Sequence, residues 1–155
     1  MTVRKYGPDG KEAGAYLPRS LFPAGLEPGM TGWQRSSSIV VAHDRVGLRA
    51  FSGDRGDKTE WVELDLKGVL LSRLRLDEFR HFPRVALTVD GDLFVQNQES
   101  KTQTHRLYKL DRASSAWQMV DTPPGGWLEG ADGDALVFSD SDLGPMHVRW
   151  YPHPK

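Results

Sequence analysis

The sequence predicts an all-β protein made of short antiparallel strands. A strand–turn–strand pattern recurs along the chain, as "VAHDRVGLRAF", "TVDGDLFVQN" and "GADGDALVFS". Apolar residues alternate with a period of two, which is typical of strands rather than helices. The 16 glycines and 10 prolines among 155 residues favour a fold with many turns. We therefore expect little helix, with at most a single turn in "RLRLDEFRHF".

The repeat has a regular length. The aspartates that end the first strand of each hairpin, Asp44, Asp90 and Asp132, lie 46 and 42 residues apart. The next strand, "WVELDLKG" and later "RLYKLDRAS", carries Asp65 and Asp111, which are again 46 residues apart. A fourth strand follows in each unit, as "GVLLSRLRL" and "AWQMVDT". Four antiparallel strands in this length match one β-propeller blade.

The individual strands and turns agree with this interpretation. Val85, Leu87 and Val89 fall on one face of a strand, as a period of two requires. The "DG" dipeptides suit tight hairpins, because glycine adopts a positive φ without steric cost. We expect Gly91 and Gly133 to lie in equivalent turns between first and second strands.

The chain resembles six-bladed propellers of the NHL-like or YncE-like kind. The resemblance is carried by "VDGDLFV" and "ADGDALVF" with the following strands "LYKLD" and "WVELD", and "VRKYGPDGKEAGAYL" is similar to the third and fourth strands of such a blade. It implies one propeller-type domain over residues 1–155, about half of a six-bladed ring. The predicted blades are a partial blade at 1–20, full blades at 36–77 and 84–121, and a partial blade at 126–152.

About three blades cannot close a ring, since propellers have four or more. We expect a homodimer, in which the N-terminal strands of one copy complete the C-terminal blade of the other. Alternatively, the missing half belongs to a longer parent chain or to a separate polypeptide. One detail opposes the swap: "MHVRWYP" and "MTVRKYG" both resemble third strands, so the swapped blade has one strand too many.

Composition excludes several classes of partner and site. The formal charge of −1 and the pI near 6.5 argue against nucleic acid or anionic membrane as a partner. The lack of cysteine excludes disulfides, thiolate metal sites and a cysteine nucleophile. The start, "MTVRKYGPDGK", has charges where a signal peptide needs an apolar run, and no stretch has the length of a membrane span. The compartment stays open.

Most candidate ligand-binding residues fall on the long loops, which all lie at one end of the predicted blades, and Trp127 and Glu129 fall on the predicted inner strand "GWLEGA". His81 and its arginine neighbours suit an anion or acid–base chemistry near neutral pH, and the alternative is a surface loop. The two tryptophans suit a planar ligand such as a sugar, and the alternative is core packing. The candidates are Trp33, Arg35, Arg80, His81, Arg84, Trp127 and Glu129.

These observations predict a non-catalytic binding and interaction scaffold. The sequence has no recognisable catalytic motif, so we expect no catalytic residues, no bound metal and no cofactor. One alternative is an enzyme of the six-bladed lactonase or hydrolase kind, with a channel metal held by Glu129, Asn97 and Asp140. Another is a lectin with equivalent sugar pockets, which would repeat the same aromatic and amide residues in each unit.

Overall fold

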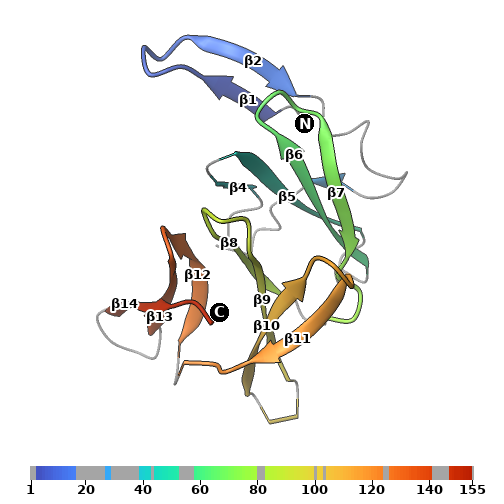
Figure 1. Ribbon diagram of the computed structural model, residues 1–155, viewed down its shortest axis with the longest axis vertical. Coiled ribbons are helices and arrows are strands. Elements are labelled where there is room, and N and C mark those ends of the chain that lie inside the picture. The colour runs from blue at the N-terminus through green and yellow to red at the C-terminus, as the bar shows by residue number, and fades with distance from the viewer. Residues whose placement is uncertain are drawn as a thin grey trace. The chain divides into compact units, whose positions relative to one another are not determined.

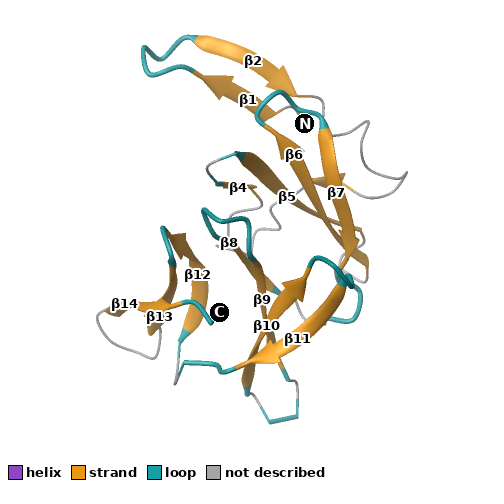
Figure 2. Ribbon diagram, in the orientation of Figure 1, coloured by secondary structure: helices purple, strands orange, loops and turns teal. Residues whose placement is uncertain are grey.

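The computed structural model is all-β throughout the residues that it describes, and none of them is helical (Figures 1 and 2). The all-β prediction is therefore confirmed. The described residues are 3–16, 27–28, 39–42, 44–52, 58–79, 83–99, 101–102, 104–123, 126–140 and 147–154. Within these ranges, no helix is long and apolar enough to cross a membrane.

The strands are short and each sheet is antiparallel. In chain order they are β1 (Val3–Tyr6), β2 (Glu12–Tyr16), β3 (Glu27–Pro28), β4 (Ile39–Val41), β5 (Arg45–Ser52), β6 (Lys58–Asp65), β7 (Leu70–Arg75), β8 (Arg84–Leu87), β9 (Leu93–Gln98), β10 (His105–Asp111), β11 (Ala116–Val120), β12 (Trp127–Asp132), β13 (Ala135–Asp140) and β14 (His147–Pro152).

The chain divides into two compact units. The first comprises Met1–Ile39 and Arg45–Asp77, and the second comprises Val40–Asp44 and Glu78–Lys155. β3 (Glu27–Pro28), which pairs with β5, lies outside the residue ranges predicted for the blades, whereas the other strands fall within them. A single propeller-type domain over residues 1–155 stays a prediction.

The first unit contains the β1–β2 hairpin and a sheet with the strand order β3-β5-β6-β7. One face of this sheet is apolar, because alternate residues of β5 and β6 point the same way. Val46, Leu48, Val62 and Leu64 form a buried cluster there, and Ile39 packs against it. The other face carries Trp61, which is fully buried.

Trp61 is buried against a glycine of the neighbouring strand. A Cβ atom on Gly47 would lie 2.0 Å from Cζ2 of Trp61, so the indole occupies the space that any side chain at this position would need. The indole Nε1 donates a hydrogen bond to Oε1 of the buried Glu63 at 3.0 Å, and Arg45 forms an ion pair with the same carboxylate at 3.3 Å. The absence of a side chain at Gly47 is thus a packing requirement.

The second unit contains two sheets whose first strands, β8 and β12, lie side by side (Figure 1). The sheet β8–β11 is a four-stranded meander, and β12–β14 is a three-stranded one. Their facing side chains form one apolar core. Its buried members are Ala86, Phe94, Leu107, Leu128, Leu136 and Phe138, with Val120, Ala131 and Tyr151 packed against them.

Phe79 covers the other face of the β8–β11 sheet. Its ring lies 5.1 Å from the rings of both Tyr108 and Trp117, with the Trp117 pair edge-on. The "DEFRHF" segment that contains Phe79 has no helix among its described residues, which agrees with the single turn expected from the sequence.

One tight turn recurs in three hairpins. It spans Gly7–Lys11, Asp65–Val69 and Thr88–Asp92, and in each the fourth residue is a glycine whose amide donates to the carbonyl of the first, at 2.9, 3.0 and 3.0 Å. These glycines have φ values of 75°, 89° and 85°, the left-handed conformation that such turns require.

Gly133 also has a positive φ, of 58°, but it lies in a two-residue turn between the paired Asp132 and Ala135. Gly91 and Gly133 therefore both connect the first and second strands of a sheet. They occupy different positions within their turns, so the two turns are not equivalent in conformation.

Candidate functional site

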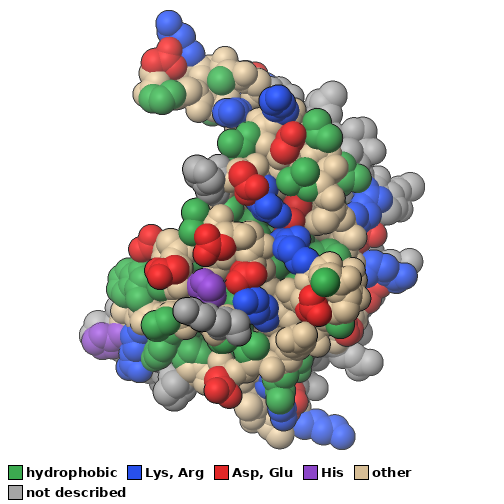
Figure 3. All heavy atoms as spheres, viewed as in Figure 1, with side chains coloured by type: hydrophobic (Ala, Val, Ile, Leu, Met, Phe, Trp, Pro, Cys, Tyr) green, Lys and Arg blue, Asp and Glu red, His purple; other side chains and the backbone are tan. Residues whose placement is uncertain are grey.

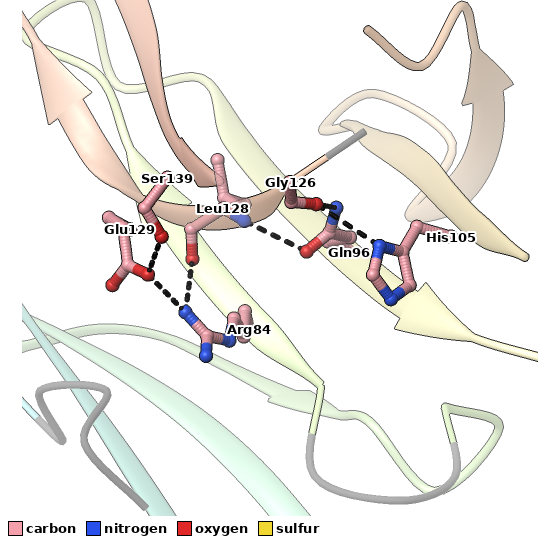
Figure 4. Close-up of polar contacts among 7 residues, drawn as sticks. All are labelled: Arg84, Gln96, His105, Gly126, Leu128, Glu129 and Ser139. Atoms are coloured by element: carbon pink, nitrogen blue, oxygen red, sulfur yellow. Dashed lines mark hydrogen bonds and ion pairs between the residues drawn. The ribbon is translucent and has the colours of Figure 1, made fainter. Parts of the chain in front are cut away.

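The structure brings three of the predicted ligand-binding residues together, in the second unit. Nη1 of Arg84 on β8 lies 2.6 Å from Oε1 of Glu129 on β12 (Figure 4). The guanidinium carbon of Arg84 also lies 4.7 Å from the ring centroid of Trp127, which is a cation–π distance. The cluster therefore connects the first strands of the two sheets.

A β-bulge places Glu129 in this cluster. Along β12, Leu128 pairs with Phe138 and Gly130 pairs with Val137, so Glu129 is an extra residue without a partner on β13. A bulge bends its strand and re-aims the side chain of the extra residue. Here the Glu129 carboxylate accepts hydrogen bonds from Arg84 and from the hydroxyl of Ser139.

Gln96 joins the two sheets through backbone groups. It lies on β9 opposite Arg84, and its Oε1 accepts a hydrogen bond from the Leu128 amide at 2.8 Å. Its Nε2 donates to the Gly126 carbonyl at 3.1 Å. Gln96 is buried, so its side-chain amide satisfies the backbone amide of Leu128 and is one of two donors to the Gly126 carbonyl.

His105, the first residue of β10, completes the cluster. Its Nδ1 lies 3.1 Å from the Gly126 carbonyl, which can only accept, so Nδ1 carries a proton. Nε2 is buried and has no hydrogen-bond partner. The imidazole lies 4.1 Å from the Trp127 ring, tilted by 47°. The indole therefore contacts both His105 and the Arg84 guanidinium.

The polar contacts of Arg84, Gln96 and Glu129 connect the β8–β11 sheet with the β12–β14 sheet, and we call them the polar tie. The Arg84 and Glu129 side chains are 22% and 36% exposed, so their ion pair is partly screened and contributes about 1 kcal/mol or less. The larger role is geometric, because each contact fixes β12 against β8 and β9. The Glu129 carboxylate is engaged by Arg84 and Ser139, so metal binding there would have to compete with both contacts.

The other predicted site residues are distributed differently. Trp33, Arg35, Arg80 and His81 lie outside the described residues. Most of the long loops predicted to form the ligand end also lie outside them.

The residues of the alternative metal site are not seen together. Asn97 follows Gln96 directly on β9, so the two side chains point to opposite faces of the sheet, and Asn97 is separated from the Glu129 cluster. Its Oδ1 is buried without a hydrogen-bond partner. The side chain of Asp140 lies outside the described part of the structure. Among the described residues, no three His, Asp or Glu side chains are close enough together to hold a metal ion.

Sequence reasoning did not identify Gln96, His105 or Ser139 as members of this cluster. Gln96 carries a signal in retrospect, because it is the first polar residue of the strand "LFVQNQ" after three buried apolar residues. His105 begins β10 and His147 begins β14, but His105 is partly buried and His147 is exposed, so the two positions have different surroundings. No local pattern indicates the Ser139 contact, since it depends on the bulge at Glu129.

Comparison of the chain with protein-family models, with curated proteins and with solved structures gives no match in any of the three cases. The function is therefore argued from the sheets and from the contacts described above.

Proposed function

We propose that this chain is a non-catalytic, propeller-type module that assembles through the open edge of β14 and serves as a binding scaffold. The observation that carries the proposal is the unequal number of strands in the sheets of the described residues. Among these residues, β8–β11 has four strands, whereas β12–β14 has three and β1–β2 has two. A strand with an unpaired edge is a template for pairing with another chain.

The packing of the two sheets in the second unit supports the propeller interpretation. Their first strands are adjacent, and their facing side chains share one apolar core. Neighbouring blades of a propeller are related in this way, because their inner strands surround a central axis. The polar tie of Arg84, Gln96 and Glu129 adds directed contacts at the same inner strands.

The outer surface of β14 supports an interface. Val148 and Trp150 are 39% and 57% exposed, and hydrophobic side chains are visible over the β12–β14 sheet in Figure 3. We propose that the occupant is the N-terminal hairpin of a second copy. The sequences Val3–Tyr6 and Val148–Tyr151 are similar, and the completed sheet would have five strands, one more than a propeller blade.

The direction of the β14 amides defines a selective test. The His153 amide donates to the Asp134 carbonyl at 3.2 Å, and Pro152, which has no N–H, pairs with Ala135. By the alternation of an antiparallel ladder, the amides of Arg149 and Tyr151 point toward β13, and those of Val148 and Trp150 point toward the open edge. A proline at position 148 therefore removes an outward donor and leaves the contacts with β13 in place.

The experiment compares Val148→Pro with Val148→Thr in sedimentation velocity, with far-ultraviolet circular dichroism to check folding. The expected result is that Val148→Pro shifts the dimer to monomer while the strand spectrum is kept, and that Val148→Thr stays dimeric. A folded Val148→Pro variant that remains fully dimeric would reject β14 pairing. A wild-type monomer would instead support completion by a longer parent chain or a different polypeptide.

A further inference from the structure

A cavity of about 330 Å³ lies in the second unit, where β11 and β14 end. Its position follows from the sequence. Pro123 lies shortly after the end of β11. Pro152 is the last residue of β14, and Pro154 lies just beyond it. Proline has no N–H group, so it cannot donate a hydrogen bond to a neighbouring strand. Both segments therefore leave their sheets at this point and line the space beyond the apolar core. The volume lies at the lower end of the range for small-molecule sites.

The walls of this cavity are mostly apolar and are held in place by the core. Leu107 and Leu136 are buried members of the core between the sheets, and both line the cavity. Tyr151 also lines it, and its ring packs edge-on against Phe138 at 5.6 Å. Thr122 is fixed by the Leu107 amide, which donates to its hydroxyl oxygen at 2.9 Å. These residues form a preorganised surface.

Two polar groups in the lining have no hydrogen-bond or ion-pair partner among the described residues. Neither the Asp121 carboxylate nor the Tyr151 hydroxyl makes a hydrogen bond or ion pair in the described part of the chain. Asp121 is also the one charged side chain among the lining residues that the structure describes. The nearby Lys109 donates to the Pro154 carbonyl at 3.3 Å, but its ammonium is paired with Asp92 at 2.8 Å. The charge facing the cavity is therefore negative.

We propose that this cavity binds a small organic cation with a compact apolar or aromatic body. The ammonium group would pair with Asp121, and its hydrogen bond would be charge-assisted. The body would lie against the Tyr151 ring and the proline rings, with the buried Leu107 and Leu136 beneath them. An apolar pocket with a few polar groups at its wall is the usual form of a small-molecule site.

The test is a titration of the full-length chain followed by ¹⁵N–¹H correlation spectra, with three probes of similar size. The probes are phenethylammonium, the neutral 2-phenylethanol and the anionic 3-phenylpropionate. The expected result is saturable shifts at Leu107, Thr122, Leu136 and Tyr151 with the cation, at least about five-fold weaker binding of the alcohol, and no saturable shift with the anion. This readout does not depend on dimer formation, so it is separable from the assembly proposal.

Matched variants test the role of the carboxylate. Asp121→Asn should weaken binding of the cation about ten-fold and leave that of the alcohol unchanged. Asp90→Asn, at an exposed turn position away from the cavity lining, should bind the cation like the wild type. Asp121 is exposed and makes no protein contact, so both variants should keep the unfolding midpoint of the wild type.

Three results would overturn the proposal. The first is equal binding of the cation by Asp121→Asn and the wild type. The second is equal affinity for the three probes. The third is the absence of saturable shifts at these residues up to about 10 mM of the cation, because a specific site of this kind binds more tightly than that concentration.

Discussion

Gly91 closes the turn between β8 and β9 at a φ of 85°, and its carbonyl accepts hydrogen bonds from Nε and Nη2 of Arg112. A β-branched residue resists this conformation. We expect Gly91→Val to lower the free energy of unfolding by about 1–2 kcal/mol or more. Gly14→Val is the matched control, because Gly14 lies in β2 without a positive φ and has open space where a Cβ would be. Equal urea midpoints for the two variants would show that the turn tolerates a side chain.

Gly47 is constrained by packing and not by φ. We expect Gly47→Ala to lower the free energy of unfolding by about 1–3 kcal/mol, because its methyl group would overlap the buried indole of Trp61. The measurement is a denaturant titration of Gly47→Ala and Trp61→Phe, singly and together. A smaller ring at position 61 should reduce the cost of the alanine, so strictly additive effects of the two substitutions would argue against the overlap.

Asp65 ends β6 and Asp111 ends β10, and both have carboxylates that accept local hydrogen bonds. The Val69 amide, which donates to Asp65 at 2.8 Å, lowers the pKa of Asp65 below its ordinary value. The Ser114 hydroxyl and then the Ala113 amide lower the pKa of Asp111. The ionised form of Asp65 thus stabilises the turn between β6 and β7, and that of Asp111 stabilises the turn between β10 and β11.

The pH dependence of stability follows from these depressed values. A carboxyl whose pKa is lower in the folded state contributes stability above its unfolded pKa of about 4, and loses it as the pH falls through the folded pKa. We expect Asp65→Asn and Asp111→Asn to destabilise the protein at pH 7, and to show a smaller loss of stability on acidification than the wild type. The measurement is the urea midpoint of each variant at several pH values from 7 down to below about 4, the pKa of the unfolded carboxyl. A wild-type-like acid slope in both variants would contradict it.

At the scale of elements, Gln96 is the contact between β9 and β12 whose loss should cost most. Replacing it with methionine leaves the Leu128 amide without its partner and leaves the Gly126 carbonyl with His105 Nδ1 alone. We expect Gln96→Met to cost about 1–3 kcal/mol, the penalty for unsatisfied buried polar groups, and to speed hydrogen exchange of the Leu128 amide. Gln118→Met, at an exposed position of β11, is the control. Unchanged exchange at Leu128 in the Gln96 variant would contradict the tie.

The strands were predictable from the sequence because alternation is a local property. Leu74 and Leu76 belong to the more buried face of the β7 segment, and Arg73 and Arg75 to the exposed one, as a period of two requires. Gly91 and Gly133 were placed correctly between first and second strands for the same reason. Their different turn geometries depend on the pairing register of each hairpin, which the shared "DG" dipeptide does not encode.

The cluster of Arg84, Trp127 and Glu129 was predictable only as separate residues. Their contacts depend on a bulge in β12 and on the packing of β12 against β8, both of which are tertiary features. Gln96 and His105 satisfy backbone groups of another sheet, so their roles follow from where the sheets meet and not from any neighbouring residue. Side chains that hydrogen-bond to backbone groups far away in the sequence are the hardest to predict from the sequence.

For the whole molecule, the central proposal is the assembly of two copies of the chain. Among the residues that the structure describes, the β12–β14 sheet has three strands and the β1–β2 hairpin has two, fewer than the four of a propeller blade. Pairing β14 with the hairpin of a second copy covers an open edge and buries exposed apolar side chains such as Val148, at about 25 cal/mol per Å² of apolar surface. Deletion of residues 1–17 should then abolish the dimer or cause aggregation.

The most direct measurement is multi-angle light scattering of the purified chain at micromolar concentration, beside the chain that lacks residues 1–17. We expect the full chain to have twice the mass of the 17.4 kDa monomer, and the shortened chain to lose that mass or to aggregate. A full chain that is a well-behaved monomer at this concentration would contradict the account.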